Sequence, residues 1–197
     1  MDAERDEEIP VQERIITAAT RLFAEKGYAG TSTAEIVSAA GVTKPMVYYY
    51  FGDKEGLFRA VMDQVNRRLR DGFAGIDRRE LPPREALVAI AELMFQATRE
   101  SPTTSRLQFA SYYGPGEGEA SKILEIGPMT TYEAIRKVVK AGLDAGVLAG
   151  DAFQIACSIQ GTINLYIMAH LSRPQVVPLA EGFGEQVIAL LIDGIGA

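Results

Sequence analysis

Two short predicted helices, separated by the turn Ala40-Gly41-Val42-Thr43, constrain the fold of this chain more than any other feature. Gly41 suits the left-handed position that ends one helix, and Thr43 is a good N-cap for the next. Pro45 then falls in the first turn of the second helix, where its missing amide costs nothing. The segment is therefore a predicted helix-turn-helix, whose second helix runs to about Phe51.

Helical periodicity continues through most of the remaining chain. No alternating run of apolar and polar residues is bounded by an Asn-Gly or Asp-Gly turn, whereas apolar residues recur at helical spacing. The sequence therefore predicts an all-α fold of about nine helices. Gly27 is placed to end a first helix from about Pro10 to Lys26. Ser32 and Glu35 have the spacing of a capping box at the start of the second helix.

The helices after the motif define two predicted domains. Asp53 is expected to cap a fourth helix, and the domain boundary lies near Asp71. Later helices are expected at about Pro82–Glu100, around Phe109–Tyr113, and at about Ala120–Ala145, Asp151–Leu171 and Leu179–Ile195. Residues 9–71 are thus a predicted three-helix helix-turn-helix head with its connecting helix. Residues 72–197 form a predicted helical domain for ligand binding and dimerisation.

The sequence favours a cytoplasmic protein without a membrane partner. Its most apolar region, Phe153–Leu171, is interrupted by Gln154, Gln160 and Asn164, which argues against a membrane span. Its acidic start lacks the basic and apolar regions of a signal peptide.

Charge is distributed unevenly along the chain. The formal net charge is −6, and by segment it is −4 for residues 1–8, +3 for 9–70 and −5 for 71–197. The only net-basic segment contains the helix-turn-helix. This polarity is expected of a DNA-facing head on an acidic body.

The second helix of the motif is predicted to expose aromatic side chains. At 100° per residue, Val47 and Phe51 share the face that points to the core. The side chains that point outward are Pro45, Met46, Tyr48 and Tyr49, with Lys44 and Tyr50 on the flanks. Exposed tyrosines suit a partner that offers phosphate oxygens to hydroxyl groups and thymine methyls to aromatic faces. Because a helix-turn-helix places its second helix in the major groove, the predicted partner is double-stranded DNA.

Residues 9–60 resemble the tetracycline-repressor (TetR) family in motif detail. The resemblance rests on Gly27-Tyr28, on Thr31-Ser32-Thr33-Ala34-Glu35-Ile36 and on the continuous stretch from Ala40 through Tyr48-Tyr49-Tyr50-Phe51 to Phe58. It implies a homodimer that binds an operator. It also implies that an effector in the C-terminal domain changes the separation of the two heads through the fourth helix.

The same resemblance implies which residues contact DNA. They are Thr33, Thr43, Lys44, Pro45, Met46, Tyr48, Tyr49, Tyr50 and Lys54. Thr33 and Lys54 are implied phosphate contacts, and the helix N-terminus at Thr33 supports that role independently. Tyr50 stands where many relatives have histidine, and Ala34 stands where some have a base-reading arginine. Lys44 is therefore the only long cation on the predicted reading surface.

The last two predicted helices are candidates for a dimer interface. Apolar residues occupy nearly the whole circumference of the helix at Asp151–Leu171, so it must be buried on more than one side. With the final helix it is expected to form a four-helix interface across a two-fold axis. The side chains expected in that interface are Ile159, Ile163, Ile167, Val187 and Leu191. A monomer with one large core is the alternative.

The middle helices carry aromatic and thioether side chains that suit an apolar pocket for a small effector. These are Met94, Phe95, Phe109, Tyr112, Met129 and Tyr132. They fit plain core packing equally well, and both interpretations stay open at this point.

An enzyme is not expected. His170 and Cys157, the only histidine and cysteine, point about 220° apart on one predicted helix and cannot form a dyad. No catalytic motif was found, and neither a cofactor nor a metal is expected. We therefore predict a homodimeric repressor that a small-molecule effector releases from a palindromic operator. Alternatives are a ligand-independent or activating regulator of the same fold, or a helical enzyme fused to a DNA-binding head.

Overall fold

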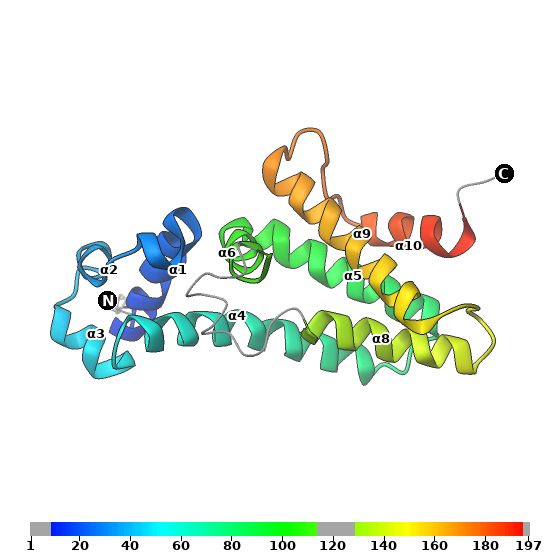
Figure 1. Ribbon diagram of the computed structural model, residues 1–197, viewed down its shortest axis with the longest axis horizontal. Coiled ribbons are helices and arrows are strands. Elements are labelled where there is room, and N and C mark those ends of the chain that lie inside the picture. The colour runs from blue at the N-terminus through cyan, green and yellow to red at the C-terminus, as the bar shows by residue number, and fades with distance from the viewer. Residues whose placement is uncertain (1–8, 114–128, 195–197) are drawn as a thin grey trace, which may run out of the picture. The chain divides into compact units, whose positions relative to one another are not determined.

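The structure, a computed structural model, describes residues 9–113 and 129–194, without the side chains of Tyr112, Tyr113 and Met129. Every regular element in this part is a helix, which confirms the all-α prediction (Figure 1). The helices are α1 (Val11–Gly30), α2 (Thr33–Ala40), α3 (Lys44–Phe51), α4 (Lys54–Asp77), α5 (Pro83–Glu100), α6 (Pro102–Tyr113), α8 (Met129–Asp144), α9 (Ala152–Ser172) and α10 (Phe183–Asp193).

The chain divides into two compact units. Of the described residues, the N-terminal unit contains 9–64 and 106–113, and the C-terminal unit contains 65–105 and 129–194. Helix α4 begins in the N-terminal unit and ends in the C-terminal unit, while α6 runs from the C-terminal unit into the N-terminal one. The domain boundary near Asp71 stays a prediction.

The core of the N-terminal unit is aromatic. Helix α1 buries one face at helical spacing, and the residues are Ile15, Ala18, Ala19, Leu22 and Phe23. Phe58 of α4 meets Phe23 edge-on at 5.1 Å between ring centroids and lies 5.0 Å from Tyr28. Gly27, with φ of 71°, interrupts α1 where its regular part was predicted to end. Leu107 of α6 is buried in the same cluster, so a residue distant in sequence completes the head.

The C-terminal unit is a bundle built around α5. Helix α5 packs against α8 and α10, and α9 packs against α8 (Figure 1). Two of these helices begin where the sequence predicted. Pro83 begins α5, and the Asp151 side chain caps α9 by accepting a hydrogen bond of 2.9 Å from the Gln154 amide.

Helix α9 buries only one stripe, which places most of the side chains expected at a dimer interface in the core of the single chain. The buried residues Ala156, Ile159, Ile163 and Ile167 recur every three or four positions. Ile159, Ile163, Ile167 and Val187 of α10 are each at most 3% exposed within a single chain. A side chain with so little free surface is part of its own subunit's core and has none to offer a second copy. Only Leu191 of the predicted set is half-buried.

Helix α10 begins later than the predicted Leu179. The carbonyl oxygens of Leu179 and Ala180 accept hydrogen bonds of 2.9 and 3.2 Å from the Arg99 guanidinium. The left-handed Gly182, with φ of 79°, directly precedes the helix. Gly184 lies so close to α5 that a Cβ there would be 2.9 Å from the Glu92 amide nitrogen. The later start is thus a consequence of packing against α5.

Four of the six side chains predicted to line an effector pocket are described, and they lie in different surroundings. Phe95 is fully buried 5.6 Å from the Phe183 ring, so it belongs to the core. Met94 is buried and its sulfur lies 3.8 Å from the Thr131 hydroxyl, while the half-buried Tyr132 faces the Phe153 ring at 6.4 Å. Phe109 is half-buried and belongs to the N-terminal unit. The side chains of Tyr112 and Met129 lie outside the described part.

None of the helices in the ranges 9–113 and 129–194 is both long and apolar enough to cross a membrane.

Candidate nucleic-acid interface

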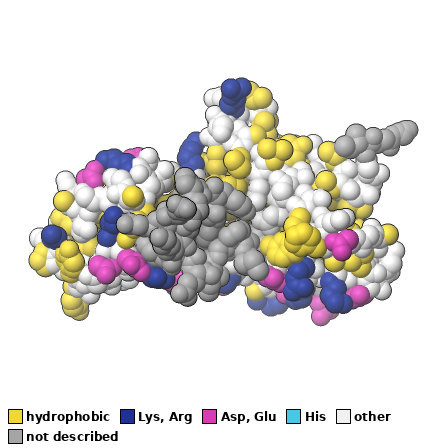
Figure 2. Space-filling model, viewed as in Figure 1, with side chains coloured by type: hydrophobic (Ala, Val, Ile, Leu, Met, Phe, Trp, Pro, Cys, Tyr) yellow, Lys and Arg dark blue, Asp and Glu magenta, His cyan; other side chains and the backbone are white. Residues whose placement is uncertain are grey.

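Helix α3 presents an aromatic face to solvent, as predicted. Val47 is fully buried and anchors the helix to the core, and Phe51 is half-buried. Tyr49 is 83% exposed, and Met46, Tyr48 and Tyr50 are between 39% and 46% exposed. Hydrophobic side chains accordingly reach the surface over α3 in Figure 2. Because large apolar groups are seldom left in water without a partner, this face is the candidate interface.

Arg14 holds the turn that orients α3, and sequence reasoning missed it. Its Nε and Nη2 donate hydrogen bonds to the Ala40 carbonyl (3.1 and 2.7 Å), and Nη2 also donates to the Gly41 carbonyl (2.8 Å). These carbonyls lie at the C-terminal end of α2, where a cation is favourable. Gly41 adopts the predicted left-handed conformation, with φ of 62°, and a Cβ there would lie 2.9 Å from Arg14 Nη2. No local sequence pattern signals this contact, because it joins residues 26 positions apart.

The N-terminus of α3 lacks the side-chain cap that was expected from Thr43. Thr43 occupies the N-cap position with extended backbone angles, but its side chain makes no capping hydrogen bond. The exposed Thr43 hydroxyl has no partner among the described residues, which leaves it available for an external acceptor.

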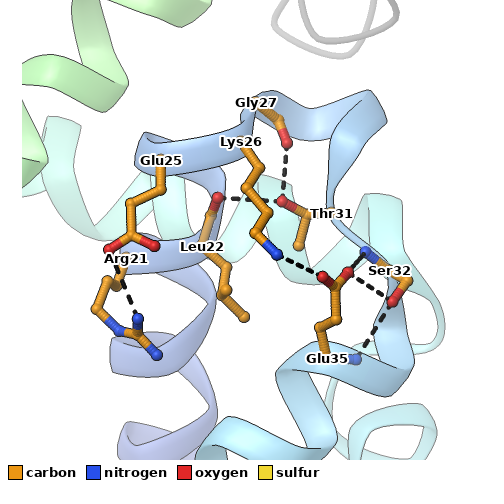
Figure 3. A network of polar contacts seen from close by, with 8 residues as sticks. All are labelled: Arg21, Leu22, Glu25, Lys26, Gly27, Thr31, Ser32 and Glu35. Carbon is orange, nitrogen blue, oxygen red and sulfur yellow. Dashed lines mark hydrogen bonds and ion pairs between the residues drawn. The ribbon is translucent and has the colours of Figure 1, made fainter.

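The N-terminus of α2 is fixed by the predicted capping box, drawn in Figure 3. The Glu35 amide donates to Ser32 Oγ at 3.2 Å, and the Ser32 amide donates to Glu35 Oε2 at 2.8 Å. Lys26 adds an ion pair of 2.5 Å to Glu35. The hydrogen bonds from Lys26 and Ser32 lower the pKa of Glu35 to about 2, because they stabilise the carboxylate form. Beside the box, the buried Thr31 hydroxyl donates to the Leu22 and Gly27 carbonyls of α1 (Figure 3).

Lys44 and Lys54 stand in different surroundings. Lys44 is exposed at the start of α3, and its ammonium lies 5.7 Å from the centroid of the Tyr48 ring. Lys54 is half-buried and donates to the carbonyl oxygens of Tyr28 (3.0 Å) and Thr31 (3.2 Å). It also lies 4.2 Å from the Tyr28 ring centroid. An ammonium has three donors, so Lys54 keeps one for another acceptor.

The charge of the candidate interface corrects a sequence-based expectation. Residues 9–64 contain six Lys and Arg against six Asp and Glu, so they carry no net charge. The excess found for residues 9–70 comes from Arg67, Arg68 and Arg70, which lie in the C-terminal unit. Residues 9–70 do carry a net charge of +3, but the three arginines that produce it lie outside the helix-turn-helix.

The arrangement suits recognition of DNA by shape and by uncharged groups. The recognition helix exposes phenol hydroxyls and aromatic faces, and the preceding residues add Thr33, Thr43 and the free amides at the start of α2. Such groups donate to phosphate oxygens and contact thymine methyls at the edges of bases. The exposed Lys44 ammonium is the group that can donate to a guanine edge.

The chain's single cysteine and single histidine both lie in the C-terminal unit. Cys157 is exposed on α9. His170 Nδ1 lies 2.8 Å from the Val177 carbonyl, a contact that ties the end of α9 to the following loop. Within the described ranges, no three His, Cys, Asp or Glu side chains are grouped as a metal site would need.

Comparisons with known proteins agree with this geometry. The profile described as "Bacterial regulatory proteins, tetR family" matches residues 15–61. The HTH-type transcriptional regulator BetI of Rhizobium meliloti (strain 1021) is 30% identical over 171 residues, which cover 85% of this chain and 82% of BetI. AcrR of Shigella flexneri, another HTH-type transcriptional regulator, is 24% identical over 189 residues, covering 91% and 87% of the two chains.

Solved structures share the fold. The TetR family transcriptional regulator PfmR from Thermus thermophilus superposes with a TM-score of 0.74 at 23% identity, covering 93% of this chain and all of its own. The transcriptional regulator FadR from Bacillus subtilis, solved in complex with stearoyl-CoA, gives a TM-score of 0.77 at 20% identity and covers 93% and 99%.

Proposed function

Because this chain belongs to the TetR family of bacterial regulatory proteins, we propose that it is a repressor that binds a palindromic operator as a homodimer and is released by a small effector. The observation that carries the proposal is the orientation of α3. Val47 is buried while the tyrosines beside it stay exposed, on a helix whose N-terminus is held by the turn. This is the arrangement that places the start of a recognition helix against base edges.

We assign reading and anchoring to different residues. Thr43, Lys44, Pro45 and Met46 lie at the start of α3 and would meet base edges. The phenols of Tyr48, Tyr49 and Tyr50 would meet phosphates and thymine methyls. Thr33, at the start of α2, and the free N–H of Lys54 would meet phosphates.

The proposed dimer forms through the exposed stripe of α9. Leu165 and Met168 are 66% and 50% exposed and point away from the buried isoleucines, while the exposed Phe153 lies at the edge of this stripe, against Tyr132 of α8. The small residues Cys157 and Gly161 lie on this same face, and open space surrounds the position of a Cβ at Gly161. Hydrophobic side chains reach the surface over α9 in Figure 2. An apolar stripe with small residues at its centre allows close approach of a second copy of the helix.

The proposed effector site lies within the C-terminal unit. Met94 and Tyr132 remain candidates for its lining, together with the buried polar side chains of Thr98 and Thr131. The solved FadR complex with stearoyl-CoA shows that a protein of this fold binds a small molecule. The same capacity in this chain is part of the proposal.

Substitution of the two lysines tests the assignment of reading and anchoring. Lys44→Ala should relax base preference and cost about 1–3 kcal/mol on the preferred site, because it removes a base-edge donor. Lys54→Ala should weaken binding to all sequences alike. Selection from random DNA gives the preferred sequence of each variant, and titration gives its affinity. Thermal melting is the control for Lys54→Ala, since this variant also loses two hydrogen bonds to carbonyls. An unchanged preference and affinity in Lys44→Ala would show that our register for α3 is wrong.

A further inference from the structure

Nearly all cations among the described residues of the N-terminal unit are engaged by the protein itself. Arg21 pairs with Glu25, Lys26 with Glu35, and Arg59 with Glu55. Arg14 and Lys54 donate to backbone carbonyls, and Arg106 also has an interaction within the chain. Within residues 9–64, Lys44 is the one cation with neither a carboxylate nor a carbonyl partner.

The paired cations bring no net charge to a phosphate. If Lys26 turned toward a phosphate, Glu35 would stay beside it, because the carboxylate is also held by Ser32. The attraction of the cation and the repulsion of the carboxylate would then largely cancel. Arg59 and Glu55, one helical turn apart on α4, have the same relation. Residues 9–64 are therefore neutral in total, and the surface around each of these ion pairs is close to neutral as well.

Uncharged donors take the place of these cations. The hydroxyls of Tyr48, Tyr49 and Tyr50 have no partner among the described residues, and neither do those of Thr33 and Thr43. All five lie on the predicted DNA-contacting helices or at their first residues. Hydroxyls of this kind bind phosphate oxygens without displacing counterions, because they carry no charge.

We infer that this regulator holds its operator mainly through uncharged groups, so that its affinity depends only weakly on salt. The inference rests on the proposed function and concerns the same surface. Among residues 9–64, two cations per head can reach DNA, namely Lys44 and the free N–H of Lys54. For a dimer this gives four at most, and therefore a slope of log affinity against log salt no steeper than about −4.

Two arginines of the C-terminal unit are the other positive charges that could contact DNA phosphates. Arg67 and Arg70 are exposed on α4, and neither has a partner among the described residues. If they anchored DNA, each would add to the slope. We infer that they do not, because Arg67 already lies about 20 Å along α4 from Lys54, on the part of the helix that belongs to the C-terminal unit.

The test is a titration of an operator duplex, recovered by selection from random DNA, at salt concentrations from about 50 to 200 mM. Wild-type affinity should fall by less than about 250-fold over this range, whereas six to ten phosphate contacts would give a loss of about 10³–10⁵-fold. A slope steeper than about −4 overturns the inference. Failure to bind any duplex selectively at any salt concentration would instead overturn the proposed function.

Two double variants identify the groups responsible. Tyr49→Phe with Tyr50→Phe removes two hydroxyls and keeps the rings, so it should lower affinity severalfold at every salt concentration without changing the slope. Arg67→Ala with Arg70→Ala should leave both affinity and slope unchanged. If the arginine variant instead makes the slope shallower, these residues anchor the DNA and the inference is wrong. The inference also fails if the tyrosine variant binds as tightly as the wild type.

Discussion

Leu165→Glu is expected to give a folded monomer, whereas Ile163→Glu, two positions earlier on the same helix, is expected to unfold the C-terminal unit. The contrast arises because the two side chains point to opposite faces of α9. Leu165 is 66% exposed and Ile163 is 1% exposed in the single chain. A glutamate at position 165 stays in water in the monomer, and it is buried without a partner only if two copies of α9 meet there. The cost in the dimer is several kcal/mol, enough to dissociate it.

The monomeric variant should lose most of its operator affinity. A dimer binds its second half-site as an intramolecular event, so its loss should weaken binding by at least about 100-fold. Sedimentation measures the mass of each variant, and circular dichroism measures its helicity and melting temperature. A Leu165→Glu protein that remains dimeric would place the interface elsewhere. An Ile163→Glu protein that melts like the wild type would contradict the burial of Ile163.

Phe58→Ala is expected to cost the N-terminal unit about 3–5 kcal/mol, the usual range for deleting a buried phenylalanine side chain. Phe58 is fully buried and contacts both Phe23 and Tyr28, so its removal leaves a cavity between α1 and α4. At about 0.05–0.15 kcal/mol per residue, residues 9–64 have only about 3–8 kcal/mol of stability, so this loss should remove most of it and with it the ability to bind DNA. Hydrogen exchange read by mass spectrometry should show protection lost over residues 9–64 and retained over residues 129–194.

Tyr49→Ala is the matched control for Phe58→Ala. It also removes an aromatic ring from the N-terminal unit, but Tyr49 is 83% exposed and holds nothing in the core. This variant should lose DNA affinity while keeping wild-type protection. If Phe58→Ala retains full protection over residues 9–64, the aromatic cluster does not support the head.

Local patterns predicted the helix-turn-helix well. The capping box at Ser32 and Glu35, the left-handed Gly41 and the proline at the start of α3 are each decided by residues within four positions of one another. The exposed and buried faces of α3 followed for the same reason, because helical spacing alone separates Val47 from its tyrosine neighbours. Such features depend on backbone geometry rather than on the rest of the fold.

Contacts between distant residues were not predictable from the sequence. Arg14 reaches Ala40 and Gly41 across 26 positions or more, and no spacing rule announces it. The sequence could not tell which face of α9 packs inside the chain, because apolar residues surround the helix, and only packing against α5 and α8 shows that the isoleucines are used internally. The charge of the head was overestimated because α4 runs without a break from the N-terminal unit into the C-terminal unit. Nothing in the sequence shows that Arg67 already lies in the C-terminal unit.

The most direct test of the account is selection of bound duplexes from random-sequence DNA by the full-length protein, followed by footprinting of the recovered site. We predict a site with dyad symmetry whose two half-sites lie in major grooves about 34–36 Å apart, or at a related multiple if two dimers bind. This result would follow from two α3 helices brought together by one α9 interface. Recovery of no common sequence, or a protected site without dyad symmetry, would contradict the assignment of this chain as a dimeric operator-binding regulator.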